Sequence, residues 1–151
     1  MANFIEMVKW DQLLEATKET IYMTSISVFA TFILGLFLGL LLFLTDKGNI
    51  WANRTVHVII AGFVNIFRSI PFIILIVLLI PFTKLLLGTM LGANAALPAL
   101  ITGTAPFYAR MVEIALREID KGVIEASQSM GATHGNIIFK VLIPESLPAL
   151  I

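Results

Sequence analysis

The residues able to carry chemistry in this 151-residue chain are few and scattered. It has no cysteine, which excludes disulfides, thiol nucleophiles and thiolate metal sites. His57 and His134 lie far apart without carboxylates at ligand spacing, so no metal site is expected. No Gly-x4-Gly-Lys-Ser/Thr loop occurs to bind the phosphates of ATP. We therefore expect a non-catalytic protein without a cofactor of its own, and any nucleotide chemistry would belong to a partner.

Arg68 is a charged residue with functional potential, because it interrupts an otherwise apolar stretch. A charge at membrane depth costs about 2.5–3.5 kcal/mol on insertion scales unless it is paired or reaches the headgroups. Together with Ser69 and Pro71, Arg68 would line or gate a path for a polar solute. The alternative is that its side chain only extends to the headgroup region. The residues alone leave both interpretations open.

Charge returns to the chain after Arg110, and this charged stretch is expected to emerge into water. Its members are Glu113, Arg117, Glu118, Asp120, Lys121 and Glu125. From Gly122 onward, apolar residues recur at helical spacing in two groups, one before Gly131 and one before Pro144. The pattern predicts two short amphipathic helices joined at a glycine-containing bend.

The elements that position these residues are predicted to be membrane-spanning helices. The composition is 58% hydrophobic and only 13% charged, with a mean hydropathy of +0.95, whereas soluble domains carry about 25% charged residues. Roughly 20 apolar residues are needed to cross the hydrocarbon core. Spans are predicted over residues 20–45, 58–81 and 85–109, with a second helix starting at Pro71, capped by Ser69, as the alternative for the middle span. The predicted fold class is an all-α, polytopic membrane helix bundle.

Residues 1–19 form an N-terminal segment with one apolar helical face and Trp10 as an interfacial anchor. An equally good alternative is a helix that simply leads into the first span. A secretory leader is disfavoured because acidic residues outnumber lysines there. Basic residues concentrate in the loops that would be internal if the N-terminus lies outside, which favours that orientation. Ten basic residues balance ten acidic ones, so no nucleic-acid partner is indicated.

Small and helix-breaking residues predict how the spans pack. Gly35 and Gly39 form a GxxxG pair suited to close helix approach, with chance occurrence as the alternative. Gly88 and Gly92 repeat the spacing where a turn is the better interpretation. The second and third spans are expected to be kinked or broken, because they contain Pro71, Pro81, Pro98 and Pro106.

The segment of residues 117–146 resembles the EAA loop of ABC importer permeases. Glu125, Ala126 and Ser127 stand at its Glu-Ala-Ala, and Gly131 at its glycine four positions later. The closing Ile-x-Leu-Pro is matched by Val141, Leu142, Ile143 and Pro144. Upstream, FRSIPFIIL and APFYARMVE are similar to segments of methionine-type permeases, whereas polar amino acid permeases carry Arg-Gly-Thr-Pro at the first of these.

The resemblance implies a type I importer permease of the bacterial inner membrane, with residues 20–151 as its permease domain. It also implies a permease homodimer, two cytoplasmic ABC ATPase subunits, and an extracytoplasmic binding protein or lipoprotein. The ATPase-docking residues would be Glu125, Ala126, Gly131, Ala132, Thr133 and His134. Such permeases have five spans, so the three predicted here indicate a chain truncated after the EAA loop.

The expected function is therefore translocation of D- or L-methionine, or a related amino acid, coupled to a partner ATPase. A polar amino acid permease and a non-transporting membrane fragment are alternatives. An ion-coupled secondary transporter is a further one, but the predicted spans contain no Asp or Glu to bind a coupling ion.

Overall fold

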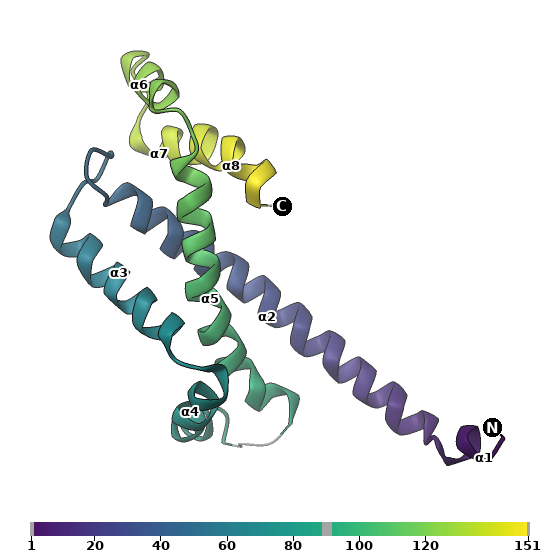
Figure 1. The fold of residues 1–151 in the computed structure, drawn as a ribbon. Helices are drawn as coiled ribbons and strands as arrows, with labels where there is room; N and C mark the ends of the chain where they lie inside the picture. Colours follow the sequence, from purple (N-terminus) through teal and green to yellow (C-terminus); the bar gives the residue numbers. More distant parts are fainter. Residues whose placement is uncertain (1, 89–91, 151) are drawn as a thin grey trace.

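The computed structural model describes residues 2–88 and 92–150, and these residues form helices connected by short loops, with no strand among them (Figure 1). The all-α prediction is confirmed. In chain order the helices are α1 (Ala2–Met7), α2 (Trp10–Leu44), α3 (Arg54–Ser69), α4 (Phe72–Leu87), α5 (Ala93–Arg117), α6 (Lys121–Ser129), α7 (His134–Asn136), the π-helix η1 (Ile137–Leu142) and α8 (Ile143–Leu150).

Helix α2 contains the first predicted span and meets the length and hydropathy criteria for crossing a membrane. It begins at Trp10, so residues 10–19 are its first turns and match the alternative of a helix leading into the span. In Figure 1 this N-terminal part of α2 extends beyond the other helices. The predicted interfacial segment is thus helical, but most of it is continuous with the first span.

The second predicted span is not one continuous helix over residues 58–81. Helices α3 and α4 meet at an angle of 110°, and only as this bent pair do they satisfy the criteria for a span. Pro71 is the cause, because proline disfavours the helical region for the residue before it, and Ile70 has ψ 123°. The expected break is confirmed at Pro71. Ser69 does not cap α4, since its Oγ donates instead to the Asn65 carbonyl at 2.8 Å.

The third predicted span, residues 85–109, is shifted toward the C-terminus. Residues 85–87 are the last turn of α4, which ends at the left-handed Gly88 (φ 71°), and α5 begins after Gly92 (φ 94°). These glycines therefore make turns, as predicted. Helix α5 does not meet the hydropathy criterion alone. It contacts α2, α3, α4 and α8, so much of its surface faces other helices. Threonine, glycine and proline are therefore tolerated in this helix.

The predicted GxxxG packing is confirmed, because α2 crosses α5 at Gly35 and Gly39. A Cβ on Gly39 would lie 2.5 Å from the Val112 Cβ and 2.7 Å from the Ala109 backbone oxygen. A Cβ on Gly35 would overlap the Tyr108 ring at Cδ1. Only glycine permits this approach of the two helices.

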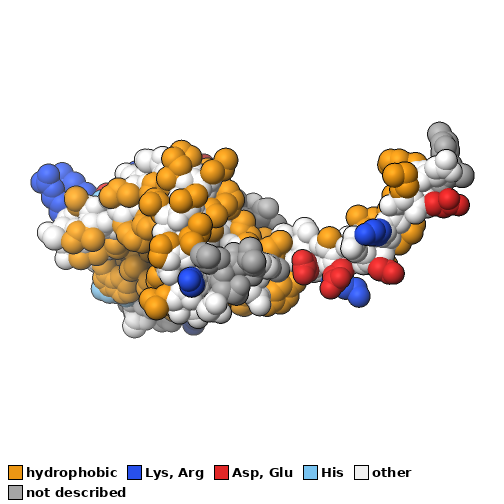
Figure 2. All heavy atoms as spheres, turned by 90° about the horizontal axis from the view of Figure 1, so that it is seen from below, with side chains coloured by type: hydrophobic (Ala, Val, Ile, Leu, Met, Phe, Trp, Pro, Cys, Tyr) orange, Lys and Arg blue, Asp and Glu red, His pale blue; other side chains and the backbone are white. Residues whose placement is uncertain are grey.

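A buried apolar cluster joins the end of α2, the end of α5, α6 and η1. Its buried members are Phe43, Leu44, Val112, Leu116, Ile124, Ile137, Ile138 and Leu142. Elsewhere large apolar side chains are exposed, among them Phe29, Ile73 and Leu85, and hydrophobic atoms cover much of the face in Figure 2. Apolar exposure on this scale is typical of lipid-facing or subunit-facing helices.

Candidate functional site

The C-terminal segment folds as predicted, into helices joined at a glycine bend. Asp120 caps α6 by accepting the Gly122 N–H at 2.9 Å. After α6 the chain turns at Gly131, whose φ of +82° is strained for residues with a Cβ. Thr133 then caps α7, its Oγ1 accepting the Asn136 N–H at 3.3 Å. Two side-chain caps and one left-handed glycine therefore define the bend.

The predicted docking residues lie on α6 and on this bend. Ala132, Thr133 and His134 follow Gly131 directly, and Ala132 is half-buried against the apolar cluster, whereas the others are exposed. Glu125 and Ala126 are exposed on α6. Within the described part of the chain, the Glu125 carboxylate makes no hydrogen bond. The bend thus offers exposed side chains on an anchored backbone.

The closing motif behaves differently from the prediction that the helix ends at Pro144. The Ile143 N–H donates to the Ile138 carbonyl, five residues back, which completes the π-helix. Pro144 falls in the first turn of α8, which continues directly from the π-helix, and its ring has no N–H to donate to the carbonyls of the preceding turn. Val141 and Ile143 are half-buried. The helix therefore widens just before the proline and continues to Leu150.

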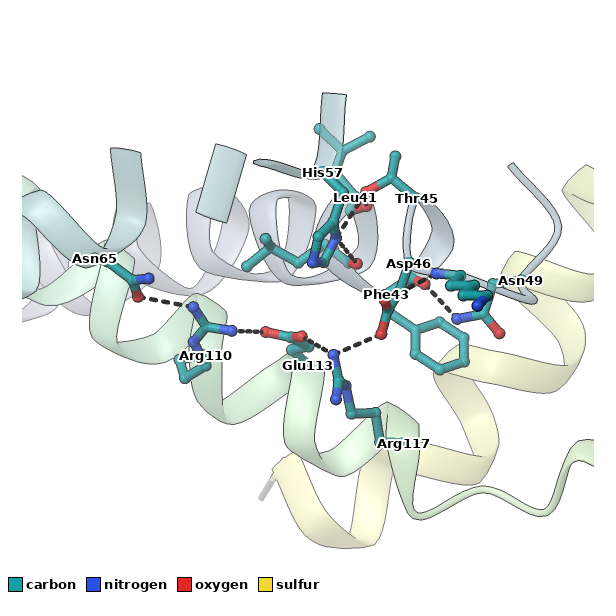
Figure 3. Close-up of polar contacts among 12 residues, drawn as sticks. Leu41, Phe43, Thr45, Asp46, Asn49, His57, Asn65, Arg110, Glu113 and Arg117 are labelled. Carbon is teal, nitrogen blue, oxygen red and sulfur yellow. Dashed lines mark hydrogen bonds and ion pairs between the residues drawn. The ribbon is translucent and has the colours of Figure 1, made fainter. Parts of the chain in front are cut away.

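A chain of charged and polar groups links α5 to α3 and to the loop that follows α2, next to this segment (Figure 3). Glu113 is buried (side chain 2% exposed), with Arg110 at 2.5 Å and Arg117 at 2.7 Å from its two carboxylate oxygens. Arg117 also contacts Asp46 at 2.6 Å, and Arg110 donates to Asn65 Oδ1 at 2.8 Å. The expectation that Glu113 emerges into water is wrong, because two arginines compensate its charge inside the protein.

A second polar contact joins the α2–α3 loop to the bend. Trp51 Nε1 donates to His134 Nδ1 at 2.8 Å, across 83 positions of sequence. His57 lies in the first turn of α3, with its Nδ1 3.0 Å from the Leu42 carbonyl and 3.3 Å from Thr45 Oγ1. The two histidines therefore have separate structural settings. Among the described residues no group of three or more potential metal ligands occurs.

Arg68, Ser69 and Pro71 lie at the α3–α4 break (Figure 1), and Arg68 lies beside the middle of α5. The Arg68 guanidinium carbon lies 5.9 Å from the centre of the Phe107 ring on α5. Both residues line a pocket of about 390 Å³, together with Phe67, Ile70, Phe72, Leu75, Gly103 and Thr104. Arg68 therefore faces a protein pocket, and the predicted docking residues form a separate region.

Sequence reasoning missed Trp51, Asp46 and Asn65. A signal existed only for the arginines, because Arg110, Glu113 and Arg117 have the i, i+3 and i, i+4 spacing of helical ion pairs. The partners on α2, α3 and the loop come from distant positions, for which periodicity carries no information.

Comparison with known proteins gives consistent matches. Residues 31–151 match the family described as binding-protein-dependent transport system inner membrane component. The methionine import system permease protein MetP of Bacillus subtilis (strain 168) is 68% identical over 149 residues, which cover 99% of this chain and 67% of that protein. The D-methionine transport system permease protein MetI of Escherichia coli (strain K12) is 52% identical over 139 residues, 92% and 64% of the two chains.

Solved structures agree. A solved structure of the MetNI methionine ABC transporter in an inward-facing conformation superposes on this chain with a TM-score of 0.91 at 50% sequence identity. The match covers 95% of this chain and 68% of that one. An amino acid ABC transporter with histidines, at 20% identity and a TM-score of 0.54, shows the fold alone. The chain thus spans about two thirds of the length of the relatives it matches.

Proposed function

The chain belongs to the binding-protein-dependent transport system inner membrane component family and has the polytopic helical fold of a type I ABC permease, and from this premise we propose that it is the permease subunit of an ATP-driven methionine importer. Methionine, in its L or D form, is the substrate class because relatives at 52% and 68% identity are named for methionine transport. The subunit supplies the path through the membrane and no catalytic group.

The observation that carries this proposal is the exposed bend at Gly131 on a rigid base. Ile137, Ile138 and Leu142 anchor the segment after the bend in the same buried cluster as Phe43 and Val112. A force on the bend would therefore be transmitted to α2 and α5 rather than absorbed by a flexible loop. This is the property that a docking segment for a motor subunit requires.

The proposed partners follow from this role. A cytoplasmic ABC ATPase binds the exposed Gly131–His134 bend, with Glu125 and Ala126 on the adjoining helix. A second copy of the permease completes the path, and an extracytoplasmic binding protein or lipoprotein delivers the amino acid. The N-terminus then lies outside, in agreement with the distribution of basic residues. Closure of the ATPases would tilt α2 and α5 between inward-facing and outward-facing arrangements.

Uptake of labelled methionine tests the proposal. Cells with the complete assembly, with and without this subunit, are compared for L- and D-methionine. We expect uptake to require the subunit, to stop on ATP depletion and to survive an uncoupler alone. Uptake that stops with the uncoupler while ATP is maintained would indicate a secondary transporter, and unchanged uptake without the subunit would indicate a non-transporting protein.

A further inference from the structure

Trp51, in the loop between α2 and α3, contacts the docking bend directly. Its indole Nε1 lies 2.8 Å from His134 Nδ1, and the two rings meet edge to face at 73° with centroids 5.9 Å apart. His134 is the first residue of α7, directly after the Thr133 cap. One loop residue thus fixes the ring of a residue that the proposed function places against the ATPase.

The loop that carries Trp51 is itself held in place. The Trp51 backbone N–H donates to the Leu44 carbonyl at 3.1 Å, and the Asn53 N–H donates to the Thr45 carbonyl at 3.0 Å. Asn49 Nδ2 donates to the Phe43 carbonyl at 2.6 Å. These bonds attach the loop to the end of α2. The indole is therefore pre-organised rather than free to follow the histidine.

The chemistry of the contact determines the state of His134. An indole N–H only donates hydrogen bonds, so His134 Nδ1 must accept. A neutral imidazole that accepts at one nitrogen carries its hydrogen on the other, and this places the hydrogen on Nε2. In the described ranges, 2–88 and 92–150, Nε2 has no hydrogen-bond partner, and the side chain is exposed. Nε2–H is available as a donor.

We propose that Trp51 is a positioning residue for ATPase docking: it holds His134 as the Nε2–H tautomer, in one orientation, so that Nε2–H donates to a carbonyl or carboxylate oxygen of the ATPase subunit. The inference rests on the proposed function, in which His134 lies in the docking contact. It adds a second element, the α2–α3 loop, to a contact otherwise made by the segment after α5.

The test measures ATPase binding by the full-length permease dimer in nanodiscs. Trp51→Phe keeps an aromatic ring and removes the N–H, and Trp10→Phe is the matched control at the chain's other tryptophan, at the exposed start of α2. We expect Trp51→Phe to weaken ATPase binding about two- to tenfold, as for loss of one hydrogen bond, and Trp10→Phe to leave it unchanged. If Trp51→Phe is poorly folded, the sulfur analogue 3-benzothienylalanine at position 51 keeps the bicyclic shape without the N–H.

A double-mutant cycle separates positioning from a general structural role. If Trp51 acts through His134, then His134→Ala weakens binding, and Trp51→Phe adds little in the His134→Ala background. Equal effects of Trp51→Phe in both backgrounds, or no effect in either, would overturn the positioning role while leaving the proposed function intact. No effect of His134→Ala would overturn both the positioning role and the assignment of His134 to docking, and methionine uptake would then decide the proposed function separately.

Discussion

Arg117 Nη2 lies 2.6 Å from Asp46 Oδ2, so the last turn of α5 is tied to the residues that follow α2. The same Arg117 nitrogen lies 2.7 Å from buried Glu113, whose other carboxylate oxygen contacts Arg110. The glycine contact of α2 with α5 lies in the preceding turns of both helices. The end of α2 and α5 are therefore joined by close backbone packing and by the Arg117–Asp46 ion pair, directly before the proposed docking segment begins.

Removing the Glu113 charge should destabilise this junction. Glu113→Gln removes the charge that Arg110 and Arg117 share, and because both arginines are partly exposed and Arg117 keeps Asp46, we expect a cost of about 1.5–3 kcal/mol, as for loss of a charged hydrogen bond. We expect a lower Tm of the purified full-length protein by thermal unfolding. Glu118→Gln, at the exposed position directly after α5, is the matched control and should change stability by under about 0.5 kcal/mol. Equal Tm values for the two variants would contradict the structural role of Glu113.

Adding a methyl group at Gly39 should separate α2 from α5. The new Cβ would meet the Ala109 backbone oxygen as well as Val112, and a backbone atom cannot rotate away. Overpacking of this kind costs about 1–3 kcal/mol. Gly62→Ala is the control, because no atom lies within 4 Å of its added Cβ and alanine favours helix. In thermal unfolding we expect Gly39→Ala to have a lower Tm than wild type and Gly62→Ala to have a Tm close to that of wild type. The reverse order of the two Tm values would rule out the close helix contact.

Gly131 should be needed for coupling rather than for insertion. Its φ of +82° costs a residue with a Cβ about 1–2 kcal/mol, so Gly131→Val would shift or loosen the bend. We expect normal membrane levels but reduced transport-coupled ATP hydrolysis in the assembled importer. Gly135→Ala, four positions later without positive φ or nearby atoms, serves as the comparison. Wild-type coupling in Gly131→Val would count against the bend as the docking element.

Replacing Arg68 should impair transport and spare assembly. Its guanidinium lies over Phe107 and lines the pocket beside the α3–α4 break, away from the Gly131 bend. If it binds the carboxylate of the amino acid, Arg68→Leu lowers uptake about tenfold or more, as expected for loss of a charged hydrogen bond. Lys84→Leu, in the last turn of α4, is the control. Unchanged uptake by Arg68→Leu, with the ATPase still bound, would favour the interpretation that Arg68 only extends to the headgroups.

The helical fold class, the approximate spans and the positions of the glycine contact and bend could be predicted from sequence, because apolar run length and glycine spacing are local signals. Gly35 and Gly39 predicted close approach of another helix, though not that the helix is α5, and Gly131 predicted the bend. The family resemblance read from Glu125 to Pro144 is confirmed by the family match over residues 31–151. Pro71 predicted a break, but the 110° turn of the chain depends on how α4 packs on α5, which no local pattern contains.

The polar contacts were harder to predict from sequence, because they join residues that are distant along the chain. Glu113 looked like the start of a water-exposed stretch, because its burial depends on arginines one turn away on either side and on Asp46 beyond them. Trp51 carried no signal, since its partner His134 is 83 positions away and a single tryptophan in a loop has many uses. Such pairs become visible only once the helices are placed.

The central claim is that the bend around Gly131 touches a nucleotide-hydrolysing subunit on the cytoplasmic side, and thiol labelling with crosslinking tests it most directly. Because the chain lacks cysteine, Met130→Cys, at a position 88% exposed, and Phe4→Cys, at one 75% exposed in α1, provide single probes. We predict that the thiol of Met130→Cys is labelled only from the cytoplasmic side and crosslinks to the ATPase, whereas the thiol of Phe4→Cys is labelled from outside and does not crosslink. Labelling of the Met130→Cys variant from outside, or its failure to crosslink in the assembled importer, would contradict the account.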